Sequence, residues 1–340
     1  MVMATPAMRA LARGFPEAEI VVEGRRLFAD LVEPLPYVHR FLPDPGRGWS
    51  ALRQRVATLR GEQFDLAVLL ADSQRAALAP WIARIPRRVG YARDLARRLL
   101  VTEALRPARE DDPGGGSRWK PTSMVEYYLG ISRHLGCPDT GGRMDVPVTE
   151  AARSAVLGRL EAAGIDPGEP LVLVVPGASF GSSKMWPAER FGEVCRALRE
   201  RHGLQLVIAP GPGEETVARA VVAAAGTGQV FENPVLSVVE AAALTSLVRL
   251  VLSNDTGPRQ FAAALGIPVV VPMGPSDPRY TAHDLTRQRV LRVDDLDCSP
   301  CGLKECPIDH RCMTRMDTGR VIEAAERLLA EFPPEQAIHA

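Results

Sequence analysis

Short apolar runs alternate with stretches of helical periodicity along most of this chain. The run at 64–70 is mostly apolar, and the run at 171–175 (Leu-Val-Leu-Val-Val) is entirely so. Runs of this kind are typical of strands buried on both faces of a parallel sheet. Segments with helical spacing follow them, at 73–85 and at 188–202. Strands alternating with helices predict parallel sheets joined by right-handed crossovers.

The alternation starts again after about residue 170, which predicts two doubly wound halves. We expect a first domain over residues 1–150 and a second over 151–340. The helix predicted at 318–331 is expected to pack back on the first domain. Further elements of the second half are predicted at 204–208, 214–225, 237–245, 250–253, 257–265 and 269–271.

The first half shows the same alternation less clearly. Residues 1–16 have the pattern of a helix and 18–23 that of a strand, so a strand preceding this helix is expected to be absent. A further strand is predicted at 88–91 and a helix at 123–135. Between them, 107–120 is rich in Pro, Asp and Gly, which predicts a mobile surface loop.

Charge and hydropathy narrow the class of protein. Among 340 residues, Lys plus Arg and Asp plus Glu number 41 each, so the basic excess typical of nucleic-acid binding is missing and no nucleic-acid partner is expected. No run approaches the roughly 20 apolar residues of a membrane span, and no export signal opens the sequence. We therefore expect a cytoplasmic protein with reduced thiols.

Ligands of doubly wound sheets bind at the carboxyl ends of strands, so the loops there are the candidate sites. The segment 176–187 follows a predicted buried strand and precedes a helix. Its glycines and serines allow backbone N–H groups to face an anion, and Lys184 adds a full positive charge suited to a diphosphate. An ordinary Gly/Ser loop with a solvated lysine fits the composition equally well. The segment is neither a Walker loop nor a GxGxxG fingerprint.

A second candidate loop, Ser-Asn-Asp-Thr-Gly at 253–257, follows the strand predicted at 250–253. Asp255 or Thr256 is placed to cap the next helix. The functional alternative is that amides here bind a phosphate while Asp255 holds a sugar hydroxyl. The segment 274–278 follows the next strand and is expected at the same edge.

Several ordered motifs together resemble glycosyltransferase family 9, the heptosyltransferases of lipopolysaccharide inner-core assembly. The form Pro-Gly-Ala-x-Phe-Gly-x-x-Lys-x-Trp-Pro at 176–187 looks closest to heptosyltransferase II. It is followed in order by Ser-Asn-Asp-Thr-Gly, Ala-Ala-Ala-Leu-Gly-Ile-Pro and Gly-Pro-Ser-Asp-Pro. In the first half, Ala4-Thr5-Pro6, Ser73-x-Arg75 and Ile85-Pro86-x-Arg88-x-Gly90-Tyr91 also look like the family, so the resemblance covers nearly the whole chain.

The resemblance implies a GT-B fold, with two Rossmann-like domains facing a cleft, and inverting transfer of heptose from ADP-heptose to the lipid A–core acceptor. No cofactor is required for that transfer. Carried onto this chain, Lys184 binds the diphosphate, Asp255 contacts the heptose, and Glu214 suits the ribose. The remaining implied donor contacts are Ser179, Phe180 and Gly181 near the diphosphate, amides of Thr256 and Gly257 at the phosphates, Leu236 and Ser237 by the adenine, and Gln260.

The sequence departs from the family in two places. Gln260 stands where the family usually has His, so titration and charge are lost there. The family also begins with a strand and a Gly-Asp turn whose Asp is a proposed general base, and this sequence starts just past that point. The catalytic residue is thus unknown. We favour a start assigned too late. The alternatives are a truncated, inactive nucleotide-sugar-binding homologue and a GT-B transferase that uses another nucleotide sugar.

Three arginines of the first half, Arg75, Arg88 and Arg93, lie at or near predicted strand ends. The resemblance suggests that they meet an acceptor bearing phosphates or acidic sugars, although solvated surface arginines are an equally good interpretation of each. Because the family's acceptor is lipid-linked, peripheral contact with the cytoplasmic face of the inner membrane is expected.

Four cysteines cluster as Cys298-x2-Cys301-x4-Cys306-x5-Cys312. This spacing in a reducing compartment predicts a structural zinc site that pins a loop, with His310 as an alternate ligand. Reduced thiols or disulfides are the alternative. Cys137 and Cys195 stand singly beside or within helical segments and are expected in the core.

Overall fold

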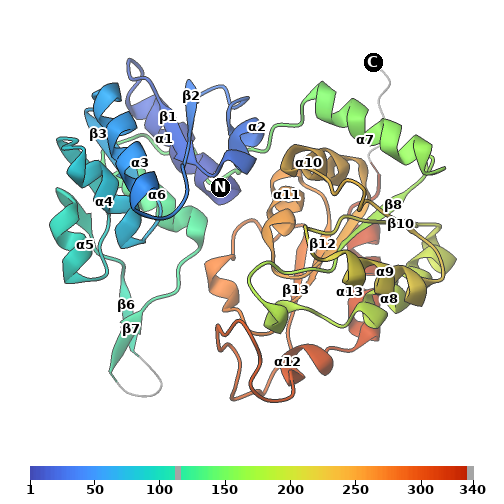
Figure 1. The fold of residues 1–340 in the computed structure, drawn as a ribbon. Helices are drawn as coiled ribbons and strands as arrows, with labels where there is room; N and C mark the ends of the chain where they lie inside the picture. The colour runs from blue at the N-terminus through green and yellow to red at the C-terminus, as the bar shows by residue number, and fades with distance from the viewer. Residues whose placement is uncertain (112–115, 335–340) are drawn as a thin grey trace. The chain divides into compact units, whose positions relative to one another are not determined.

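The computed structural model describes residues 1–111 and 116–334 (Figure 1). It divides into two compact units. The first consists mainly of Met3–Gly142, with Arg279–Thr281 grouped with it, and the second of Arg143–Pro278 and the chain from Ala282 onward. Each unit is described by itself below.

The second unit is built on one six-stranded sheet in which every strand pair is parallel. The strand order is β10-β9-β8-β11-β12-β13, so the chain moves outward from β8 first in one direction and then in the other. The strand order therefore reverses between β8 and β11. The strands are β8 (Leu171–Val175), β9 (Gln205–Ile208), β10 (Gln229–Val230), β11 (Leu250–Ser253), β12 (Val269–Pro272) and β13 (Gln288–Leu291).

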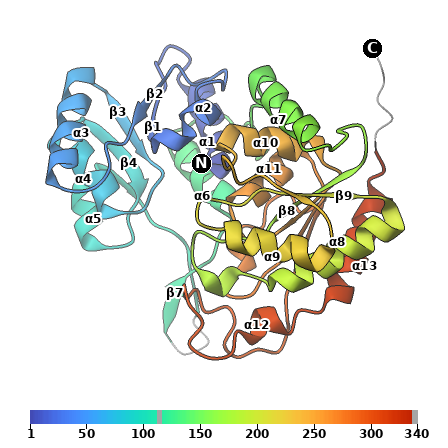
Figure 2. The ribbon, with the colours of Figure 1, turned by 45° about the vertical axis from the view of Figure 1, so that its right-hand side comes forward.

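Helices cover both faces of this sheet, as Figure 2 shows. Alternate residues of β8 supply the two cores: Val172 and Val174 face one, and Leu171, Leu173 and Val175 face the other. This separation follows from the two-residue period of a strand. The first face carries α8 (Ala188–His202), α9 (Glu215–Ala225) and α13 (Thr318–Glu331), and the second carries α7 (Glu150–Ala162), α10 (Val238–Leu247) and α11 (Gly257–Leu265).

The last helix packs within the second unit. α13 begins at an N-cap, Asp317, whose carboxylate accepts hydrogen bonds from the amides of Gly319 and Arg320. Its apolar residues Val321 and Leu328 are fully buried in the core that α8 also lines. The apolar stripe of this helix is thus used within the second unit. The expected contact with the first domain stays a prediction.

The first unit contains two separate parallel sheets. β1 (Val21–Gly24) pairs with β2 (Arg40–Pro43), and β4 (Arg87–Tyr91) lies between β3 (Leu66–Leu69) and β5 (Glu103–Leu105). Its helices are α1 (Thr5–Gly14), α2 (Ala29–Val32), α3 (Trp49–Glu62), α4 (Gln74–Ile82), α5 (Leu95–Leu100) and α6 (Met124–His134).

Part of the segment expected to be a mobile loop is ordered. β6 (Arg109–Asp111) and β7 (Ser117–Trp119) pair as an antiparallel hairpin, while 112–115 lie outside the described residues. The composition of this segment gave no sign of the strand pairing. Within the described ranges, no helix combines the length and apolar character that a bilayer crossing requires.

Candidate active site

The two candidate loops of the second unit lie next to each other, at the point where strand order reverses. One follows β8 and includes the short 3-10 helix Ser182–Lys184, and the other joins β11 to α11. β8 and β11 are paired through Ser253 and Val175 at their carboxyl ends. Open α/β sheets bind ligands at such a switch point, because adjacent loops diverge there and leave a crevice.

Asn254 joins the two loops. It is fully buried, its side-chain amide donates a hydrogen bond to the carbonyl of Pro176 (2.6 Å), and its Oδ1 accepts one from the amide of Trp186 (3.0 Å). One side chain therefore holds both ends of the loop that follows β8. No role was predicted for Asn254, although a polar side chain directly after a buried apolar strand was an available signal.

Asn254→Ala is expected to destabilise the second unit. The change leaves a buried carbonyl and a buried amide without their partner, which costs about 1–3 kcal/mol for each unsatisfied group. Urea denaturation should show this as a lower midpoint with unchanged slope. Gln54→Ala on the exposed surface of α3 is the control and should change stability by less than about 0.5 kcal/mol. Equal midpoints for the two variants would contradict the assigned role.

Lys184 and Asp255 form the charged centre of the site. Lys184 Nζ donates to Asp255 Oδ2 at 2.8 Å and to the Asp255 carbonyl at 3.2 Å. The other carboxylate oxygen of Asp255 accepts a hydrogen bond from Arg259 Nη1 at 3.0 Å. Burial alone would raise the pKa of Asp255, but Lys184 and Arg259 outweigh burial and hold that pKa below its ordinary value. Asp255 is therefore an anion between two cations.

Arg259 was not among the site residues predicted from the sequence. Its side chain is fully buried on α11, one turn after Asp255, and its Nε donates to Gln288 Oε1 at 3.0 Å. The i, i+4 spacing of opposite charges was the signal that could have identified it. Since Lys184 and Arg259 already contact the Asp255 carboxylate, the expected contact between Asp255 and heptose stays a prediction.

The amino end of α11 faces this centre without a side-chain cap. Thr256 is the N-cap residue, and its side chain makes no capping hydrogen bond; its Oγ1 lies 3.3 Å from Ser253 Oγ. The interpretation of Asp255 or Thr256 as a capping side chain is therefore wrong. Gly257, the first residue of the helix, is exposed. A helix start of this kind attracts anions through its N–H groups and its positive dipole end.

The loop after β8 presents further predicted donor residues. Ser179 and Phe180 are exposed, and the Phe180 ring centroid lies 5.0 Å from Lys184 Nζ, a cation–π distance. Gly181 passes so close to the chain near Lys304 that a Cβ there would lie 2.2 Å from the Lys304 carbonyl oxygen. Glycine is needed at this position because only its backbone can approach that closely.

Glu214 reaches the same edge from the loop after β9. Its Oε2 accepts a hydrogen bond from the amide of Gly211 (2.8 Å), and a Cβ on Gly177 would fall 1.8 Å from its carboxyl carbon. The carboxylate thus lies over the start of the loop that follows β8. This placement is compatible with the expected ribose contact, which stays a prediction.

The other predicted donor residues have structural roles. Ser237 caps α10 in a capping box with Glu240, so its hydroxyl is committed to the helix. Leu236 is half-buried against the core that α10 lines, and Gln260 is buried on α11. Their predicted contacts with the donor are untested.

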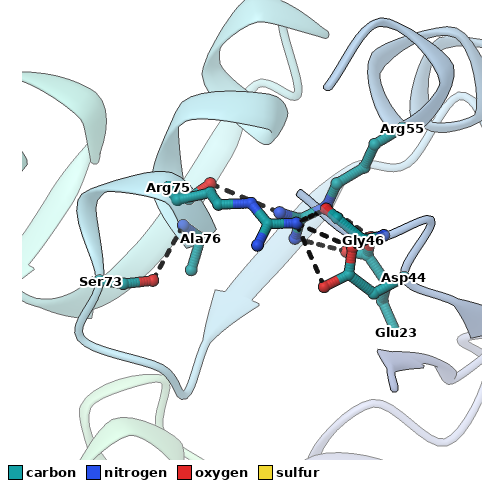
Figure 3. Close-up of polar contacts among 7 residues, drawn as sticks. All are labelled: Glu23, Asp44, Gly46, Arg55, Ser73, Arg75 and Ala76. Carbon is teal, nitrogen blue, oxygen red and sulfur yellow. Dashed lines mark hydrogen bonds and ion pairs between the residues drawn. The ribbon is translucent and has the colours of Figure 1, made fainter. Parts of the chain in front are cut away.

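In the first unit, Arg75 lies in a network of charged groups shown in Figure 3. Its Nη2 donates to Asp44 Oδ1 (3.1 Å) and to the carbonyl of Gly46. Arg55 of α3 lies in the same group and donates to Glu23 Oε2 at 2.6 Å. Arg75 is therefore anchored to the segment after β2 while its side chain remains 40% exposed.

The other two predicted acceptor arginines differ from each other. Arg93, directly after β4, pairs with Asp72 at 3.3 Å and lies over the ring of Tyr127, whose hydroxyl donates to the same carboxylate. Arg88 instead donates to the carbonyls of Leu100 (2.9 Å) and Ile85. Arg88 therefore holds local backbone, and its expected contact with the acceptor stays a prediction.

The cysteine cluster is not arranged as a metal site. Cys298 and Cys301 are exposed, Cys306 is half-buried, and Cys312 is buried, which raises the pKa of its thiol. Within the part of the chain that the structure describes, no group of three or more His, Cys, Asp or Glu side chains is placed to hold a metal ion. The zinc site stays a prediction without structural support. Cys137 and Cys195 are buried, as expected.

Heptosyltransferases are among the known proteins that resemble this chain. A sequence profile of glycosyltransferase family 9 (heptosyltransferase) matches residues 52–311. Lipopolysaccharide heptosyltransferase 2 of Escherichia coli K12 is 27% identical over 308 residues, covering 86% of this chain and 84% of that protein. Lipopolysaccharide heptosyltransferase 1 of Pseudomonas aeruginosa is 26% identical over 355 residues, covering 95% of this chain and 93% of the relative.

Solved structures agree in fold. The structure of E. coli ADP-heptose lipopolysaccharide heptosyltransferase II matches with a TM-score of 0.75 at 24% identity, covering 97% of this chain and 95% of that one. A family 9 glycosyltransferase from Veillonella parvula matches with a TM-score of 0.81 at 21% identity, covering 97% and 94%. Identities this low establish the architecture alone.

Proposed function

Because this chain belongs to glycosyltransferase family 9, the heptosyltransferases, we propose that it moves heptose with inversion from ADP-heptose to the lipopolysaccharide inner core, as a heptosyltransferase II-like enzyme. The family, the GT-B fold class and the glycosyltransferase activity predicted from the sequence are confirmed. The specific donor, the acceptor and the stereochemical outcome are the proposal.

The observation that carries the proposal is the positive centre at the switch point. Lys184 Nζ is held by Asp255 Oδ2 at 2.8 Å. Helix α11 begins two residues after Asp255, at Gly257. When the bond between the sugar and its nucleotide diphosphate breaks, the departing ADP gains negative charge. Groups held in place beforehand stabilise that charge without having to reorganise during the reaction. We assign this role to Lys184 and the amides of Thr256 and Gly257.

The acceptor side of the proposal rests on Arg75 and Arg93, which are both partly exposed in the first unit. Guanidinium groups bind phosphates and carboxylates well, as a phosphorylated core sugar requires. A lipid-linked acceptor would place the enzyme at the cytoplasmic face of the inner membrane.

The test is a transfer assay with ADP-heptose and core lipopolysaccharide from a heptose-deficient strain, with product detected by mass spectrometry. Both this 340-residue chain and the longest protein encoded by the same reading frame are assayed. Product from either one supports the proposal. Binding of ADP with no transfer by either chain would favour the inactive homologue, and transfer only from another nucleotide sugar would favour a different donor.

A further inference from the structure

The segment 302–310, which we call the clamp segment, is hydrogen-bonded to Ser183 in the loop that follows β8. Ser183 is 2% exposed, and all its polar groups contact the clamp segment. Its amide donates to the carbonyl of Lys304 (3.0 Å), its hydroxyl donates to the carbonyl of Leu303 (2.5 Å), and its carbonyl accepts from His310 Nε2 (2.6 Å). Since a carbonyl oxygen only accepts, His310 Nε2 carries the proton.

The two segments also fit closely beside this residue. Gly181 has no Cβ, which leaves room for the Lys304 carbonyl oxygen; an added Cβ would lie 2.2 Å from it. Contact at Gly181 and hydrogen bonds at Ser183 hold the loop on both sides of Ser182. The residue that follows is Lys184, whose Nζ is held by Asp255.

The clamp segment is itself fastened to the same edge of the sheet. The amide of Gly302 donates to the carbonyl of Pro275 (2.9 Å). Three residues earlier, outside the clamp segment, Ser299 Oγ donates to the carbonyl of Gly274 (2.7 Å). Within the clamp segment, the amide of His310 donates to Cys306 Sγ at 3.2 Å. The clamp segment therefore connects the loop after β12 to the loop after β8.

We propose that the clamp segment positions Lys184 for the donor diphosphate and that His310 is a positioning residue, acting through the Ser183 carbonyl. This rests on the proposed use of ADP-heptose. The clamp segment fixes the backbone of Ser183, the residue before Lys184, and Asp255 holds the Lys184 ammonium group, so little ordering remains when the diphosphate binds. Preorganisation of this kind strengthens binding by reducing the entropy that binding must overcome.

Calorimetric titration with ADP and steady-state kinetics test the inference on the full chain. His310→Ala is expected to weaken ADP binding and raise the donor KM by about fivefold to tenfold, the effect of losing one buried hydrogen bond. The acceptor KM should be unchanged, because the clamp segment acts on the donor loop. His310→Gln, which keeps an N–H donor, should recover part of the loss. The control is Arg311→Ala, which removes only an exposed pair with Asp309.

A second comparison separates positioning from general loosening. In a Lys184→Ala background, His310→Ala should weaken ADP binding by less than twofold, since the group that His310 positions is gone. Ser183→Ala removes only the hydroxyl bond to Leu303 and should give a smaller, equally donor-selective loss, which keeps the test informative if His310→Ala unfolds.

Three results would overturn the inference: normal ADP binding by both His310→Ala and Ser183→Ala, equal losses for donor and acceptor, or full additivity with Lys184→Ala. If the unsubstituted protein binds no ADP, the proposed function is wrong, and so is the inference about the clamp segment that rests on it. If it binds ADP and the variants bind equally well, only the clamp is wrong.

Discussion

Lys184→Ala is expected to lower kcat/KM for transfer by about 10²- to 10³-fold, the usual cost of removing one preorganised donor to a developing negative charge. Lys184 Nζ is the cation at the switch point, and its side chain is only 17% exposed, so solvent screens it weakly. The dissociation constant for ADP should rise as well. Initial rates at varied donor concentration and calorimetric titration with ADP measure the two effects.

The matched control is Lys304→Ala. That lysine lies in the clamp segment, is exposed, and contributes its backbone carbonyl to the contact with Ser183, so its side chain is not required there. Its removal should leave kcat/KM within about twofold, in keeping with the small effects of most exposed surface changes. A Lys184→Ala enzyme as active as Lys304→Ala would rule out the diphosphate role.

Asp255→Ala is expected to have the largest effect on stability, about 3–5 kcal/mol of unfolding free energy. The change removes the carboxylate that pairs with the fully buried guanidinium of Arg259 at 3.0 Å and with Lys184 at 2.8 Å. Removing one partner of a buried ion pair costs far more than the pair gains when intact, because the burial of the remaining charge is no longer offset by that partner. Urea denaturation measures the loss. Asp309→Ala, which breaks an exposed pair with Arg311, is the control and should leave the urea midpoint nearly unchanged.

The pH dependence of stability gives an independent check on Asp255. Its folded pKa lies below the ordinary value, so its contribution is fully present above the unfolded-state pKa of about 3.9 and is lost as the pH falls through the folded pKa. The stability difference between the unsubstituted protein and Asp255→Asn should therefore be constant near neutral pH and shrink below about pH 4. A difference that is flat to pH 2 would contradict the assigned ion pair.

The sequence by itself determined the elements whose signals are local. The apolar run at 171–175 and the helical segments 188–202 and 257–265 have the bounds of β8, α8 and α11 in the structure. Strand burial and helix periodicity are encoded over five to fifteen residues, which is why these predictions succeeded. α3 was not predicted, because charged residues interrupt its apolar pattern. β2 was not predicted, because it has only two apolar residues between Arg40 and Pro43 and neighbouring elements decide its conformation.

The sequence also determined that the candidate chemistry lies in loops directly after strands, and its motifs identified the family. Only the tertiary structure decided which side chains meet. Lys184 and Asp255 are 71 residues apart and are brought together because β8 and β11 are neighbours in the sheet. Ser183 and His310 are 127 residues apart, and no periodic pattern connects them.

The burial of Arg259 and the commitment of Arg88 to backbone carbonyls were likewise settled by packing. The residue type alone does not tell whether an arginine side chain lies in solvent, beside an acceptor or within a core. Its surroundings come from segments distant in the chain, and the free energy of a buried charge depends on those surroundings rather than on local sequence. The sequence thus indicates where the site is, and the fold decides which of its charges hold the site together.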